Sequence, residues 1–269
     1  MNKVNPMKKK LTINAIKKAK NERLLTMITA YDALFATLLQ ESADIILVGD
    51  SLNMSFNGKP DTLSATLEQM IYHTNAVCQG AKNTFVICDM PFGTYNNKRQ
   101  ALKNAIRVYQ ECPADAIKIE GGKDKADLVQ TLTENGIAVC GHIGLLPQSV
   151  RGEGGYIVRG KTPHDIEALV EDAEAIEDAG AFCIVVEGVK AEAAALIAQA
   201  VKVPVIGIGA GSGVDGQVLV FSDMLGLFEA FTPKFVKKYI NGASIVKEAV
   251  ASYKTEVETK VFPAQEHTY

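Results

Sequence analysis

The chain has 269 residues, 47% of them hydrophobic, and carries a formal net charge of −3 at neutral pH. This length is enough to bury a large core, and the slight acidity excludes a basic surface for nucleic acid or anionic membranes. No apolar run approaches the roughly 20 residues of a membrane span, and the basic N-terminal segment lacks the apolar stretch of a secretory signal. Since the five cysteines form no C-x-x-C pair, we expect a cytoplasmic protein with reduced thiols.

Short apolar and β-branched runs recur along the chain and predict eight strands. After a short frayed end, a helix is expected at about residues 12–20. The expected strands cover residues 24–32, 44–51, 84–91, 115–122, 136–144, 181–189, 203–211 and 217–224. The interval between the last two is too short for a full helix.

Segments with a helical period separate most of these strands. Residues 162–180 are the clearest, because Thr162 is a preferred N-cap, Pro163 suits the first helical position and Gly180 suits the end. Further helices are expected at residues 64–80 and at 124–136, the latter capped by Asp124. After Pro233 the pattern predicts a helical tail to about residue 258, which packs on the barrel or on a neighbouring subunit.

Eight strands alternating with helices predict an α/β fold, a (β/α)8 TIM barrel. We expect residues 1–269 to form a single domain of this type, with an N-terminal helix and a C-terminal helical tail. An open, doubly wound parallel sheet is the alternative. The number of strands and the lack of a mid-chain linker favour the barrel.

Polar residues follow the apolar runs, where barrel enzymes have their active sites. They are Tyr31, Asp32, Asp50, Ser51, Asp89, Lys118, Glu120, His142 and Glu187. Four or more carboxylates at one barrel mouth repel unless a cation or protons balance them. Oxygen ligands suit a hard divalent ion, Mg²⁺ first, although other divalent ions fit the same donors. Lys118 lies on the same strand face as Glu120 and could hold an anionic substrate.

Each residue also has a structural interpretation. Asp50 and Asp89 could cap following helices, and Asp32 is expected to do so. Lys118 could form an ion pair with Glu120 and nothing more. A structural role for His142 is as well supported as a functional one. Glu187 is harder to assign to a helix cap, because caps favour Asp, Ser and Thr.

Two glycine-rich segments need separate treatment. "GIGAGSG" at residues 207–213 does not match the G-x-G-x-x-G fingerprint of dinucleotide-binding proteins, which disfavours a nicotinamide oxidoreductase. We expect a tight turn there with close backbone approach to a ligand. "RGEGGYIVRGK" at residues 151–161 is either a mobile lid or a long exposed loop.

Seven motifs together resemble one family. They are "TAYD" at 29–32, "VGDSL" at 48–52, "DMPF" at 89–92, "KIEGG" at 118–122, "GHIGLLPQS" at 141–149, "VVEGV" at 185–189 and "GIGAGSGVDGQVLV" at 207–220. In this order and spacing the chain, from about residue 10 to its end, resembles the ketopantoate hydroxymethyltransferase family. The resemblance also implies the (β/α)8 fold.

The resemblance implies roles for five of the polar residues. Asp50 and Asp89 match metal ligands for one Mg²⁺ per subunit, with Glu120 at or just outside the first coordination shell. Asp50, Ser51, Asp89 and Lys118 match positions that bind the keto acid. Asn53, the segment "ECPADA" at 111–116 and "EGV" after the sixth strand depart from the expected pattern, but none replaces a chemical group.

The resemblance also implies the reaction. Glu187 matches the proton acceptor, and His142 matches a site histidine of less defined role. The expected reaction transfers a hydroxymethyl group from the co-substrate 5,10-methylenetetrahydrofolate to 3-methyl-2-oxobutanoate, giving 2-dehydropantoate in pantothenate biosynthesis. An enolate stabilised by the metal ion is the expected intermediate. A homo-oligomer, commonly a homodecamer, is implied as well.

Two other functions remain as alternatives. A metal-dependent carbon–carbon lyase of the isocitrate-lyase-like type would share the acidic residues but need no folate. A barrel that only binds a metal or a keto acid would catalyse no proton exchange.

Overall fold

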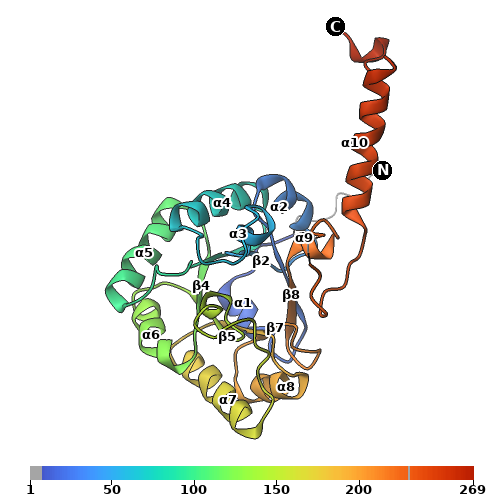
Figure 1. Ribbon diagram of the computed structural model, residues 1–269. Helices are drawn as coiled ribbons and strands as arrows, with labels where there is room; N and C mark the ends of the chain where they lie inside the picture. Colours follow the sequence, from blue (N-terminus) through green and yellow to red (C-terminus); the bar gives the residue numbers. More distant parts are fainter. Residues whose placement is uncertain (1–7, 230) are drawn as a thin grey trace. The chain divides into compact units, whose positions relative to one another are not determined.

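A computed structural model of the chain describes residues 8–229 and 231–269. Eight parallel strands form a closed barrel in chain order, and the first strand pairs with the last (Figure 1). The strands are β1 (Leu25–Thr29), β2 (Ile45–Val48), β3 (Phe85–Asp89), β4 (Ala116–Glu120), β5 (Val139–Gly144), β6 (Cys183–Glu187), β7 (Val205–Ile208) and β8 (Gly216–Leu219). This confirms the predicted (β/α)8 barrel and excludes the open sheet.

The strands are surrounded by α2 (Ala33–Leu39), α4 (Leu67–Gly80), α5 (Lys98–Glu111), α6 (Ala126–Glu134), α7 (Pro163–Asp178) and α8 (Ala191–Ala200) (Figure 1). The other helices are α1 (Ile13–Lys18), α3 (Leu52–Ser55), α9 (Phe221–Met224) and α10 (Gly242–Glu258), with 3-10 turns η1 (Lys123–Lys125), η2 (Pro147–Ser149) and η3 (Gln265–His267). The predicted ends of α7 are confirmed, since Thr162 accepts a hydrogen bond from the Asp165 amide and Gly180 has φ +100° beyond the last turn.

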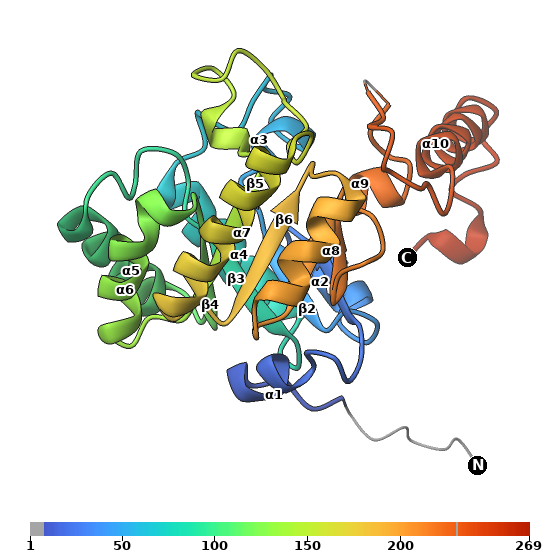
Figure 2. The same ribbon diagram turned by 90° about the horizontal axis from the view of Figure 1, so that it is seen from below.

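Helix α1 closes the barrel at the N-terminal ends of the strands. Ile16 and Ala19, at and just beyond its last turn, belong to one apolar cluster with Leu25, Phe85 and Phe182, which lie where strands begin. The two phenylalanine rings meet edge to face at 5.5 Å. Figure 2 shows α1 at one end of the barrel and α3 at the other. The opposite, C-terminal end is therefore the one left open to polar residues. The expected frayed end lies mostly in residues 1–7, outside the described residues.

The predicted last strand, residues 217–224, is wrong in its second half. Strand β8 ends at Leu219, and Phe221–Met224 form the short helix α9. A short apolar run does not distinguish a buried strand from a helix, and Asp223 favours a helical first turn. As expected, no helix lies between β7 and β8, a stretch that is described completely.

Two other boundaries differ from the prediction. Asp124 does not cap α6: it lies in η1 and accepts a hydrogen bond from the Gly122 amide at 3.1 Å, while the helix starts at Ala126. The tail helix α10 starts at Gly242 rather than near residue 233, because the Asn241–Gly242 dipeptide ends a stretch of turns.

The contacts divide the chain into two compact units, Met1–Val220 and Phe221–Tyr269. The first contains the whole barrel, and the second contains α9 and α10. The expected single domain stays a prediction. Within the described residues, none of the helices combines the length and the apolar character needed to cross a membrane.

Candidate active site

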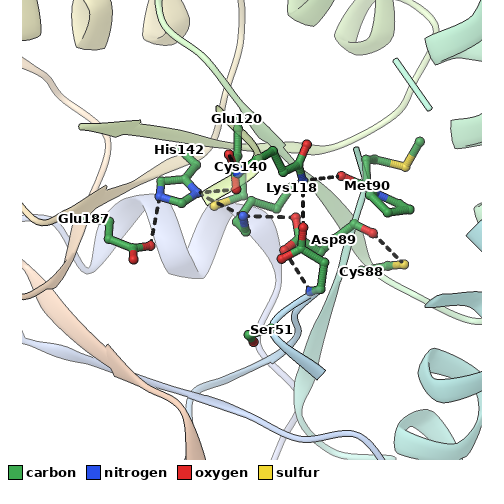
Figure 3. Close-up of polar contacts among 12 residues, drawn as sticks. Ser51, Cys88, Asp89, Met90, Lys118, Glu120, Cys140, His142 and Glu187 are labelled. Atoms are coloured by element: carbon green, nitrogen blue, oxygen red, sulfur yellow. Dashed lines mark hydrogen bonds and ion pairs between the residues drawn. The ribbon is translucent and has the colours of Figure 1, made fainter. Parts of the chain in front are cut away.

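The polar side chains that follow the strands converge at the C-terminal mouth of the barrel (Figure 3). They come from neighbouring strands, in the order Asp50 and Ser51 after β2, Asp89 on β3, Lys118 and Glu120 on β4, His142 on β5 and Glu187 on β6. Strand register places Asp89 beside Lys118 and Glu120 beside His142. Paired positions of adjacent strands share one face, so these four side chains point into the barrel.

Helix capping does not account for Asp50 or Asp89. The N-cap of α3 is Ser51, without a capping bond from its side chain, and the N-cap of α5 is Asn97. Asp32, in contrast, accepts a hydrogen bond from the Phe35 amide at 2.8 Å and caps α2, as expected. The two other aspartates are therefore available for chemistry.

Lys118 is the cation of this buried cluster. Its Nζ lies 3.0 Å from Asp89 Oδ1 and 3.0 Å from His142 Nδ1. The interpretation of Lys118 as a partner of Glu120 alone is therefore wrong. The Asp50 amide donates to the other oxygen of Asp89 at 3.2 Å, and each of these side chains is at most 4% exposed.

Burial and mutual repulsion change the ionisation of these groups. Burial, with a further contribution from Asp89, raises the pKa of Asp50 to about 8, against the opposing charge of Lys118. Burial and the neighbouring carboxylates also raise the pKa of Glu120 well above its ordinary value. Burial alone would lower the pKa of Lys118, but the surrounding carboxylates raise it. With all three carboxylates ionised the cluster has an excess of negative charge, which these raised pKa values oppose and which a cation would relieve.

His142 connects this cluster to Glu187. Burial and the Lys118 charge lower the pKa of His142, so the imidazole is neutral at pH 7. Since an ammonium only donates, His142 Nδ1 accepts from Lys118 and the ring proton lies on Nε2. That atom lies 3.2 Å from Glu187 Oε2, and Figure 3 shows the ring between Glu187 and Glu120. The Glu187 side chain is 22% exposed, unlike the buried carboxylates.

The Ser51 side chain contacts Tyr31, which follows strand β1. Its Oγ lies 2.8 Å from the Tyr31 hydroxyl, and His73 Nδ1 on α4 lies 2.6 Å from the Tyr31 carbonyl oxygen. Tyr31 is 1% exposed. The Ser51 hydroxyl is thereby oriented at the barrel mouth next to Asp50.

Two residues of the site had no role in the sequence interpretation. Gln148 on η2 donates through Nε2 to Asp50 Oδ2 at 2.9 Å, and its backbone amide donates to Glu120 Oε2 at 3.0 Å. Tyr95 donates its hydroxyl to Gln148 Oε1. Gln148 lies within the motif "GHIGLLPQS", which is a signal that could have found it, whereas nothing in the sequence around Tyr95 indicates a role.

The oxygens of this cluster are chemically suited to a divalent cation. Among the described residues, Glu120 Oε1 and Asp89 Oδ1 are buried without a hydrogen bond, and Asp89 Oδ1 has only the Lys118 ion pair. In residues 8–229 and 231–269, no group of three or more His, Cys, Asp and Glu side chains is arranged to hold a metal ion by itself. Mg²⁺ commonly takes only one or two protein carboxylates, and water or substrate completes its shell. The donor set therefore fits an ion shared with a ligand better than a closed protein cage.

The glycine-rich segments lie beside this site. The turn between β7 and β8 has positive φ at Gly209 and Gly211, which confirms a tight turn. A Cβ atom at Gly211 would lie 2.5 Å from the Ala191 side chain, so the close approach there is to α8. In residues 151–161, Arg151 pairs with Asp61 at 2.8 Å. Whether this loop moves as a lid stays a prediction.

Comparisons with known proteins agree with this geometry. Two solved structures share the fold. One is a 2,3-dimethylmalate lyase of the PEP mutase/isocitrate lyase superfamily, with TM-score 0.62 and 17% identity, and the match covers 95% of this chain and 91% of the lyase. The other is a phosphonopyruvate hydrolase in complex with oxalate and Mg²⁺, with TM-score 0.60 and 14% identity, and the match covers 95% of this chain and 92% of the hydrolase. At these identities the likeness shows the fold alone.

Sequence relatives are far closer. The 3-methyl-2-oxobutanoate hydroxymethyltransferase of Sulfurimonas denitrificans is 70% identical over 98% of this chain and its own full length. The enzyme of the same name from Aliarcobacter butzleri is 66% identical over 97% of each chain. The family model for ketopantoate hydroxymethyltransferase matches residues 10–265. The chain therefore belongs to the ketopantoate hydroxymethyltransferase family.

Proposed function

We propose that the protein transfers a hydroxymethyl group from 5,10-methylenetetrahydrofolate to 3-methyl-2-oxobutanoate and so forms 2-dehydropantoate for pantothenate biosynthesis. The new carbon–carbon bond forms between C3 of the keto acid and the one-carbon unit, after C3 has lost its proton. One water molecule supplies the oxygen of the new hydroxyl group, and tetrahydrofolate is the second product. The family assignment supports the reaction type, and the side chains at the barrel mouth support the individual roles.

A divalent ion, Mg²⁺ first, would be held by Asp50 and Asp89, with Glu120 at or just outside its coordination shell. The buried oxygens without hydrogen-bond partners and the excess of negative charge support this assignment. When bound, the ion supplies Lewis-acid stabilisation of negative charge on the keto oxygen. The Mg²⁺ named with the phosphonopyruvate hydrolase structure is in keeping with an ion in this fold.

The chain's own residues bind and orient the keto acid. Lys118 supplies a positive charge for the substrate carboxylate from within the barrel. The Ser51 hydroxyl, oriented by Tyr31, supplies a hydrogen bond at the adjacent strand end. The apolar barrel beneath these residues excludes water from the base of the site and strengthens their electrostatic effect.

Glu187 is the residue that removes the proton from C3. The observation that carries this proposal is its partial exposure beside a buried, neutral His142. A base must reach the substrate, and Glu187 is the carboxylate of the cluster that remains open to solvent. His142 Nε2, which lies 3.2 Å from Glu187 Oε2, is placed to donate to this carboxylate and so to orient it without adding a competing base.

Exchange of the C3 hydrogen for deuterium tests this role without folate. In deuterated water with Mg²⁺, the wild-type protein should exchange the C3 hydrogen of 3-methyl-2-oxobutanoate. Proton NMR measures the loss of the C3 hydrogen signal over time. Glu187→Gln should slow exchange by about 10²–10⁴-fold, the usual contribution of a general base. Glu192→Gln, on the exposed side of α8, is the matched control and should exchange normally. Exchange at the wild-type rate in Glu187→Gln would remove Glu187 from this role.

Turnover with and without the folate donor separates this proposal from the lyase alternative. The transferase forms 2-dehydropantoate only when 5,10-methylenetetrahydrofolate is present, and a chelator should abolish product formation. Carbon–carbon cleavage that continues without folate would favour a lyase. Tight keto-acid binding without exchange would favour a barrel that only binds its ligand.

We also propose a homo-oligomer, such as a homodecamer, in the cytoplasm. The outward apolar side chains of α10, including Ile245, Val246, Val250 and Tyr253, support burial of this helix against another surface. Analytical ultracentrifugation of the purified protein tests the assembly, and a monomer at micromolar concentration would contradict it.

A further inference from the structure

Gln148 makes four hydrogen bonds inside the candidate active site. It is 6% exposed, and its Nε2 donates to Asp50 Oδ2 at 2.9 Å and to the Met90 carbonyl oxygen at 3.0 Å. Its Oε1 accepts from the Tyr95 hydroxyl, and its backbone amide donates to Glu120 Oε2 at 3.0 Å. One neutral residue from the loop after β5 thus connects the ends of β2, β3 and β4.

The orientation of this amide is determined by its partners. The Met90 carbonyl oxygen can only accept hydrogen bonds, so the amide nitrogen must face it, and the same Nε2 then donates to Asp50 Oδ2. The amide oxygen then faces Tyr95, which donates. A flipped amide would place its oxygen against two other oxygens and leave the Tyr95 hydroxyl against an NH₂ group. Tyr95, itself 7% exposed, therefore stabilises the amide orientation that the Met90 carbonyl selects and that supports Asp50.

The same contacts determine which carboxylate oxygens remain free. Gln148 occupies Oδ2 of Asp50 and Oε2 of Glu120, while Oε1 of Glu120 is buried without a hydrogen bond among the described residues. Because the donor is neutral, it positions both carboxyl groups without neutralising the charge that they carry when ionised. A lysine in its place would remove part of the negative charge that attracts a cation.

We propose that Gln148 is a positioning residue for the divalent-ion site, and that Tyr95 acts through it by holding the amide oxygen in place. This inference rests on the proposed function, because it assumes that Asp50 and its neighbours hold an ion. It adds two residues to which the proposed reaction assigns no contact with the keto acid or the reacting carbon. Their effect is on the affinity for the ion and on the geometry of the carboxylates.

The test measures Mn²⁺ binding to the substrate-free protein by the electron paramagnetic resonance signal of free Mn²⁺. Gln148→Leu keeps the backbone amide and the side-chain volume but removes the bonds to Asp50, Met90 and Tyr95. Loss of a hydrogen bond that supports a metal ligand commonly costs 10–100-fold in affinity, so the Mn²⁺ dissociation constant should rise by about that factor. Tyr95→Phe should raise it by a smaller amount, about 3-fold or more.

The matched control is Tyr109→Phe. The Tyr109 hydroxyl also makes two hydrogen bonds to the backbone, accepting from the Ala138 amide at 2.9 Å and donating to the Asp115 carbonyl at 3.1 Å. These residues lie where β4 and β5 begin, at the opposite end of the barrel. This variant should bind Mn²⁺ with wild-type affinity even if its melting temperature falls.

Deuterium exchange at C3 distinguishes a positioning role from a catalytic one. Gln148→Leu should exchange slowly at low Mn²⁺ and recover most of the wild-type rate at saturating Mn²⁺, whereas Glu187→Gln should not recover. Unchanged Mn²⁺ affinity in folded Gln148→Leu overturns the inference; if that variant does not fold, unchanged affinity in Tyr95→Phe overturns it. A wild-type protein that binds no Mn²⁺ and exchanges no hydrogen would instead contradict the proposed function itself.

Discussion

Replacing Lys118 by methionine should destabilise the barrel, although it places an apolar side chain in a buried position. The ammonium lies 3.0 Å from Asp89 Oδ1, and both side chains are at most 4% exposed. Loss of one partner from a buried ion pair typically costs about 3–5 kcal/mol, because the remaining charge is left without compensation. For a unit of this size each kcal/mol corresponds to about 2–4 °C, so the melting temperature should fall by roughly 6–20 °C.

The double variant Lys118→Met/Asp89→Asn separates the charge effect from a packing effect. It removes both charges and should be more stable than the sum of the two single variants predicts, by about 2 kcal/mol of coupling energy. Urea unfolding in the presence of a chelator measures all four proteins without a contribution from bound ions. Additive effects of the two substitutions would refute the idea that this ion pair balances the cluster.

Three further predictions concern other parts of the chain. Tyr31→Phe should raise the KM for the keto acid several-fold while the protein stays folded, because the hydroxyl partner of Ser51 is lost; an unchanged KM would show that Ser51 needs no such support. Burial would raise the pKa of Asp44, but the two hydrogen bonds from the Arg23 guanidinium lower it below its ordinary value of 3.8. Its contribution should therefore be complete well above pH 3.8 and lost as the pH falls through the lower folded value. Asp44→Asn should cost about 1 kcal/mol of unfolding free energy at pH 7 and progressively less as the pH falls below 3.8, as measured by urea unfolding; an equal cost across this range would contradict this. Burial raises the pKa of Cys78 to about 12, so this thiol should react with Ellman's reagent at pH 8 far more slowly in the folded than in the unfolded protein. Absorbance measures the rate of the reaction, and mass spectrometry identifies the cysteine that has reacted.

The sequence predicts much of this site because the apolar runs determine where each strand ends. In a parallel barrel all carboxyl ends lie at the same mouth, so Asp50, Asp89 and Glu187 could be assigned to one region without knowledge of any contact. The two-residue spacing of Lys118 and Glu120 likewise predicted a shared face, and this is confirmed because their side chains lie 3.0 Å and 3.6 Å from the same atom, His142 Nδ1.

Contacts between distant segments could not be predicted in this way. Strand register decides that Lys118 pairs with Asp89 rather than with Glu120, and a single sequence does not determine register. Gln148 reaches Asp50 across 98 residues of chain, from a loop that has no periodic pattern. The error at β8 has another cause, because the run before Asp223 is too short to show a period of two or of 3.6.

The combination of charged and neutral partners explains how one buried cluster can be stable and still bind a cation. Asp50, Asp89 and Glu120, when ionised, carry three negative charges against one positive charge on Lys118, which leaves a net charge of −2. A divalent ion neutralises this remainder, whereas a second lysine would remove much of the electrostatic reason to bind one. The neutral side-chain and backbone amides of Gln148 hold the carboxylates of Asp50 and Glu120. These hydrogen bonds position the carboxylate oxygens and leave their negative charge available to a cation. A site built in this way is stabilised by its ion, so metal binding should raise the melting temperature of the wild-type protein more than that of Gln148→Leu at the same Mn²⁺ concentration.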